Sequence, residues 1–73
     1  MNRQQTEVFS IFGQIEQVAA ESMIQRHGLY RIEPADIPET ARVNDEGQVA
    51  KFAVIMPRRL VWEFNDTIAR LRA

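Results

Sequence analysis

Cysteine is absent from the 73 residues, which excludes disulfides and thiolate metal sites. Histidine occurs once, so any Ser–His–Asp arrangement would have to use His27. The simpler interpretation of His27 is a favourable charge at the C-terminal end of a helix. No glycine-rich loop precedes a predicted helix, so the motifs that cradle phosphate are missing. We therefore expect a protein that is not an enzyme, with no catalytic residues, no cofactor and no metal.

Long apolar runs and excess positive charge are also missing. The most apolar stretch, residues 49–56, is too short to cross a bilayer as a helix. The N-terminal sequence MNRQQTEV has no apolar signal region, so we expect a protein of the bacterial cytoplasm, including that of a phage-infected cell. The net charge of −1 gives no global attraction to nucleic acid. Eight of the nine basic residues are arginines, whose forked donors suit carboxylates and phosphates.

The second half of the sequence predicts a strand followed by a helix. Residues 49–56, VAKFAVIM, carry β-branched and aromatic side chains on both faces, which predicts a central strand covered on both sides. Pro57 stops the strand and can open a helix. Apolar residues then recur at three- and four-residue steps, which predicts a helix from Arg58 to Arg72.

The first half predicts a helix and shorter elements. Apolar spacing from Val8 onward predicts a helix over about Gln5–His27, with Thr6 as N-cap and Gly28 as the stop. Gly13 inside it is interpreted as a close approach to another backbone, with a hinge as the alternative. Short strands are predicted at residues 29–33 and 41–44, with a loop at 34–40 and a hairpin turn at 44–47.

These elements give the order α-β-β-β-α. We expect a small antiparallel sheet packed against helices, which is an α+β fold. A chain of this length forms one domain, here residues 1–73, with a frayed N-terminal arm at about residues 1–5.

Three residues at the start of the last predicted helix favour a binding surface. Arg58 and Arg59 oppose the helix dipole, and Trp62 lies one turn on, off the apolar stripe. Arginine and tryptophan are the residue types enriched in interface hot spots. The alternative is that Trp62 covers the edge of the core while the two arginines are solvated or paired with Glu63. Arg59 and Glu63 have the spacing of a surface ion pair, as do Asp66 and Arg70.

Phe9 and the N-terminal arm form the second candidate surface. Phe9 lies beside the apolar stripe of the first predicted helix, so it either widens that stripe or remains partly exposed. Widening of the stripe is the favoured interpretation.

Residues 51–71, KFAVIMPRRLVWEFNDTIARL, resemble the strand and first helix of ribbon-helix-helix DNA-binding proteins. The sequence departs from that family in the strand. Several polar side chains that read bases are expected there, and Lys51 is the only polar one. The resemblance implies a small dimeric DNA-binding repressor, which is the alternative function. It would require five arginines to cluster: Arg42, Arg58, Arg59, Arg70 and Arg72.

In length, arginine bias and compact α+β character, the whole chain resembles a small RNA-polymerase-binding transcription regulator of a Xanthomonas phage. That resemblance implies a monomer that docks on the large subunits of the host polymerase, inhibits initiation and promotes antitermination. It supplies no motif that aligns contact residues. A third class, an antitoxin or accessory protein stable only in its complex, stays open and would show a low melting temperature alone.

Overall fold

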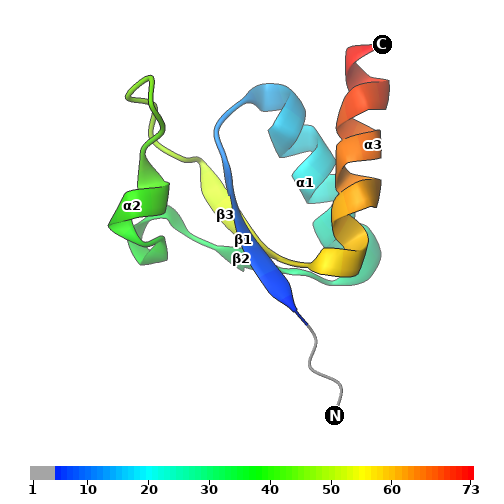
Figure 1. Ribbon diagram of the computed structural model, residues 1–73, viewed down its shortest axis with the longest axis horizontal. Helices are drawn as coiled ribbons and strands as arrows, with labels where there is room; N and C mark the ends of the chain where they lie inside the picture. Colours follow the sequence, from blue (N-terminus) through cyan, green and yellow to red (C-terminus); the bar gives the residue numbers. More distant parts are fainter. Residues whose placement is uncertain (1–4) are drawn as a thin grey trace.

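The computed structural model describes residues 5–73, which form three helices and a three-stranded antiparallel sheet, an α+β fold as predicted (Figure 1). Short 3-10 turns, η1 and η2, precede the second and third helices. In chain order the elements are β1 (Thr6–Ile11), α1 (Gln14–His27), β2 (Tyr30–Ile32), η1 (Pro34–Asp36), α2 (Glu39–Arg42), β3 (Phe52–Pro57), η2 (Arg58–Leu60) and α3 (Val61–Arg72).

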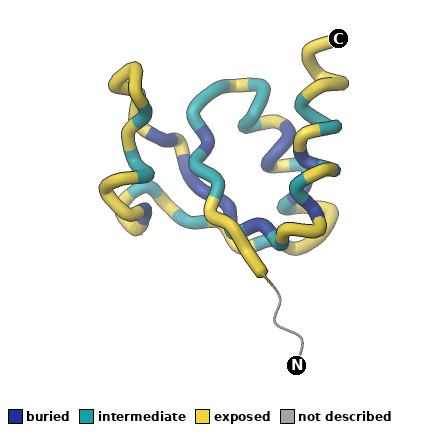
Figure 2. The backbone as a smooth tube through the Cα atoms, viewed as in Figure 1, coloured by how far each residue is buried: buried dark blue, intermediate teal, exposed yellow. Residues whose placement is uncertain are grey.

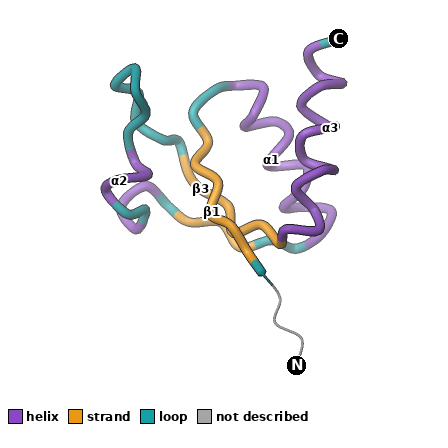
Figure 3. The backbone as a smooth tube through the Cα atoms, in the orientation of Figure 1, coloured by secondary structure: helices purple, strands orange, loops and turns teal. Residues whose placement is uncertain are grey.

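The strand β3 lies at the centre of the sheet, which has the order β1-β3-β2. Figure 3 shows the strands between α2 and the two long helices α1 and α3. Both neighbours are antiparallel to it, with Val8 and Tyr30 on either side of Ile55. Phe52, Val54 and Met56 point to one face, whereas Ala53 and Ile55 point to the other. The predicted central position of this strand is therefore confirmed, although it begins at Phe52 rather than at Val49.

Two apolar clusters cover the two faces of β3. On one face, α1 and α3 bury Phe52, Val54 and Met56 against Met23 and Phe64. Nine further apolar residues belong to this cluster or lie at its margin, including Ile11, Leu60 and Ile68. On the other face, a smaller cluster buries Ile37 against Ala50 and Ala53. Figures 1 and 2 show α1 and α3 on one side of the sheet and α2 on the other. Both faces are thus covered, but the second face only at one end.

The predicted helix over Gln5–His27 is wrong in its first third. Residues Thr6–Ile11 form the edge strand β1, and α1 begins only at Gln14. These residues fit the helical period, but they also fit the two-residue period of a strand. In a strand, Glu7, Phe9 and Ile11 lie on one face and Thr6, Val8 and Ser10 on the other. Pairing with β3 decides between the two periods, since it buries Ile11 and places Phe9 on the core.

Gly13 lies between β1 and α1 rather than inside a helix. It is the N-cap of α1 in an extended conformation, and its carbonyl accepts the Gln17 N–H at 3.0 Å. A Cβ there would meet only the mobile end of the Glu16 side chain, so the expected approach to another backbone is wrong. Gly28 does end the helix as predicted, with φ of 67° and its N–H donated to the Ile24 carbonyl at 2.8 Å.

The predicted strand over residues 41–44 is also wrong. Residues Glu39–Arg42 form the short helix α2, which Pro38 precedes as N-cap. Only Val43 pairs across the turn, as an isolated bridge to Val49. The turn itself is confirmed, with Gly47 at φ of 80°. The order of elements is therefore β-α-β-α-β-α, not α-β-β-β-α.

The expected N-terminal arm falls mostly on residues 1–4, which lie outside the described residues. Gln5 is fixed to the sheet, because its carbonyl accepts the Arg58 N–H at 3.0 Å and its side chain accepts a bond from the Arg58 guanidinium at 2.7 Å. The predicted helix over residues 58–72 is present as the turn η2 and the helix α3.

Candidate functional site: an exposed tryptophan on helix α3

The side chain of Trp62 is the most exposed large apolar group among the described residues, at 76%. It stands on the first turn of α3, whose core-facing stripe consists of Leu60, Phe64 and Ile68. At 100° per residue, this stripe directs Trp62 away from the sheet. The tryptophan therefore does not cover the core edge, and the helix holds it at the surface.

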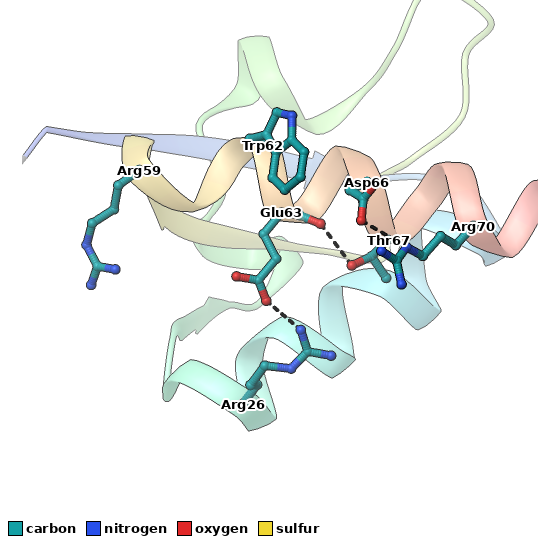
Figure 4. Close-up of a pocket in the computed structure, with 7 residues that line it drawn as sticks. All are labelled: Arg26, Arg59, Trp62, Glu63, Asp66, Thr67 and Arg70. Atoms are coloured by element: carbon teal, nitrogen blue, oxygen red, sulfur yellow. Dashed lines mark hydrogen bonds and ion pairs between the residues drawn. The ribbon is translucent and has the colours of Figure 1, made fainter.

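A shallow depression of about 500 Å³ lies beside the indole (Figure 4). We call it the Trp62 surface. Six of its residues recur at three- and four-residue steps along η2 and α3, and the seventh comes from α1; they are Arg59, Trp62, Glu63, Asp66, Thr67, Arg70 and Arg26.

Ion pairs fix most of the charged groups on this surface. The Arg26 guanidinium donates to the Glu63 carboxylate, and Arg70 Nε lies 2.9 Å from Asp66 Oδ2. The predicted Asp66–Arg70 pair is therefore confirmed. The predicted Arg59–Glu63 pair is wrong, because Glu63 is bound to α1 instead. Within residues 5–73, Arg59 has no ion-pair partner.

Glu63 joins α3 to the end of α1. The His27 Nε2 atom lies 3.1 Å from Glu63 Oε2, so His27 does more than carry a charge at a helix end. The hydrogen bond with His27, followed by that with Arg26, lowers the pKa of the Glu63 carboxyl group below its ordinary value of 4.5. The carboxylate is thus held ionised as one of the links between the two helices.

The four predicted contact residues do not form a single surface. Arg59 and Trp62 both line the depression. Arg58 turns towards β1, where its Nε lies 3.4 Å from Glu7 Oε2. Phe9 is half-buried and packs on Phe64 with ring centroids 5.7 Å apart, so it belongs to the margin of the core.

The remaining members of the Trp62 surface were not predicted as a site. Those on α3 could have been found, because the helical spacing of Arg59 and Trp62 continues through Asp66 and Arg70. The contribution of Arg26 depends on the packing of α1 beside α3, which no local pattern in the sequence indicates.

Of the five arginines needed for a DNA-binding surface, only Arg59 and Arg70 line one depression. Arg42 donates to the Ile37 carbonyl at 2.9 Å, on the side of the sheet opposite α3. Arg58, Arg70 and Arg72 are each paired with a carboxylate, those of Glu7, Asp66 and Glu16. This distribution does not provide the continuous basic patch on which phosphate binding depends.

Over the described residues, no three histidine or acidic side chains lie close enough together to hold a metal ion. The helices of residues 5–73 also lack the length and apolar character needed to cross a membrane. Comparison with protein-family models, with curated proteins and with solved structures finds no match to this chain.

Proposed function

We propose that this protein is a non-enzymatic regulator that acts by binding a larger protein through the Trp62 surface. The observation that carries the proposal is the 76% exposure of Trp62 on a well-packed helix. A tryptophan side chain contributes a large apolar area when a partner buries it. The helix fixes the backbone of Trp62 beforehand, so on binding only the side chain would lose conformational freedom.

The surroundings of Trp62 support a protein partner. Arg59 stands one turn before it, without an ion-pair partner in residues 5–73, and can donate to a carboxylate or a carbonyl. The charged residues beyond it are already paired, as in the polar rim of an interface. An apolar centre with one available arginine at its edge has the composition of a binding hot spot.

For the partner we propose the large subunits of bacterial RNA polymerase, on the basis of the whole-chain resemblance. The protein would act in the cytoplasm of the host cell. Its binding would inhibit initiation of transcription and promote antitermination, either by steric block or by stabilising one conformation of the polymerase. This mode of action requires neither a cofactor nor a metal.

The test is a calorimetric titration of the protein into purified bacterial RNA polymerase. We expect Trp62→Ala to weaken binding by at least about 2 kcal/mol, because the central aromatic anchor is lost. The matched control is Tyr30→Ala, which removes another exposed aromatic side chain from the opposite side of the sheet. It should leave the affinity unchanged.

The two parts of the proposal fail differently. If the wild-type protein does not bind polymerase, the choice of partner is wrong. If it binds and Trp62→Ala binds equally well, the choice of surface is wrong.

A further inference from the structure

The strand β1 has one hydrogen-bonding edge without a partner. It pairs with β3 on one side only, and it is an outer strand of the sheet. The Arg58 N–H bonds to the Gln5 carbonyl, so the backbone groups of residues 5, 7, 9 and 11 face β3. Those of Thr6, Val8 and Ser10 consequently face away from the sheet.

This edge lacks most of the features that protect edge strands from pairing. The sequence TEVFSI contains no proline, no lysine and no glycine, and its register with β3 is uninterrupted over all six residues. Its single charged residue, Glu7, is paired with Arg58 of the same chain. The outward-facing positions are small and uncharged, and Val8 is 48% exposed.

The edge also lies in the middle of the broadest side of the molecule. The domain measures 37 × 35 × 19 Å, and Figure 1 looks down its shortest axis, with β1 in front of β3 and β2. The helices α1 and α3 flank β1 on one side and α2 on the other. A side with these two longer dimensions has a larger area than the roughly 800 Å² that each partner contributes to a standard interface.

We propose that two copies of this chain pair antiparallel through β1, which gives a continuous six-stranded sheet. A two-fold axis at Val8 places Val8 opposite Val8 of the second copy and Thr6 opposite Ser10. This register uses all three outward-facing residues. A register centred on Glu7 would oppose two carboxylates, and one centred on Phe9 would leave Thr6 without a partner.

Pairing in this register also extends an apolar row across the dimer. Tyr30, Ile55 and Val8 lie side by side on the face of the sheet that α2 covers only in part. Tyr30 is 68% exposed. In the dimer the row continues from Val8 into the same three side chains of the second copy, which buries both valines.

A single introduced cysteine tests the register directly, because the natural chain has none. In the proposed register the two Val8 residues form a hydrogen-bonded pair, whose Cα atoms are about 5.5 Å apart and within the range of a disulfide. Under mild oxidation we expect Val8→Cys to form a covalent dimer at least about tenfold faster than Val49→Cys. Val49 is the matched control, since it is a more exposed valine outside β1, at 60%.

Sedimentation of the cysteine-free protein completes the test. We expect a monomer–dimer equilibrium, and we expect Val8→Lys to raise its dissociation constant at least about tenfold while Val49→Lys leaves it unchanged. A wild-type protein that remains monomeric at all concentrations overturns the proposal. So does a dimer in which Val8→Cys cross-links no faster than Val49→Cys. Neither outcome depends on binding of polymerase.

Discussion

At the scale of single residues, Glu63 makes the closest connection between the two long helices. Its carboxylate accepts hydrogen bonds from Arg26 and contacts His27, both in the last turn of α1. Because its pKa is lowered in the folded protein, the folded state binds fewer protons here than the unfolded chain does. The contribution of Glu63 to stability is therefore present above its ordinary pKa of 4.5 and is lost as the pH falls through the lowered value.

This linkage predicts the behaviour of Glu63→Gln. We expect the variant to be less stable than the wild type at neutral pH and to lose less stability on acidification. Urea unfolding over a series of pH values measures both effects. The control is Glu46→Gln, in an exposed turn. If Glu63→Gln and the wild type lose stability in parallel below the ordinary pKa of Glu63, the contribution assigned to its carboxylate is contradicted.

Gly28 supports a second prediction at this scale. Its φ of 67° lies in the left-handed region, and no neighbouring atom restricts a side chain there. We expect Gly28→Ala to cost about 1–2 kcal/mol, because the penalty comes from the backbone alone. Gly28→Asn should cost less, since asparagine tolerates this conformation. Thermal unfolding of both variants measures the difference, and equal costs would contradict a backbone origin.

At the scale of elements, α1 is held by the few side chains that reach the sheet. Met23 is completely buried, whereas Val18 on the same helix is 47% exposed. We expect Met23→Ala to lower the free energy of unfolding by about 2–5 kcal/mol through loss of packing and a residual cavity. Val18→Ala should stay within about 0.5 kcal/mol of the wild type. Urea unfolding distinguishes them, and similar costs would show that α1 does not pack as described.

The elements that the sequence predicts well are those whose signals are local. Gly28, Gly47 and Pro57 each mark a boundary where the structure has one. The helix α3 has an apolar pattern that fits only the helical period. The strand β3 is a short apolar run rich in β-branched and aromatic residues and bounded by Pro57, which favours a strand. The fold class followed from these elements.

The mispredicted elements depend on contacts between distant residues. The sequence around Phe9 fits a helix and a strand, and pairing with β3, more than forty residues later, selects the strand. Residues 41–44 carry no decisive pattern, and α2 forms where Pro38 starts a turn. The same reason limits prediction of the site: Arg59 and Trp62 belong to one helix, whereas Arg26 joins them only through packing of α1 on α3.

At the scale of the whole molecule, the stability of a paired form depends on protein concentration. If β1 pairs with a second copy, the melting temperature must rise with protein concentration by mass action. We expect this rise over a roughly hundredfold range of concentration for the wild type and for Val49→Lys, and its absence for Val8→Lys. Scanning calorimetry measures it. A melting temperature that is independent of concentration for all three proteins would contradict the paired form.

The central position of β3 has a consequence for synthesis of the chain. Its neighbours β1 and β2 both precede it in the sequence, and they do not pair with each other. On the ribosome, neither strand can find its partner until residues 52–57 have emerged, and Leu60 and Phe64 follow later still. A nascent chain that stalls before residue 52 therefore carries two strands without partners, a form open to chaperones and proteases.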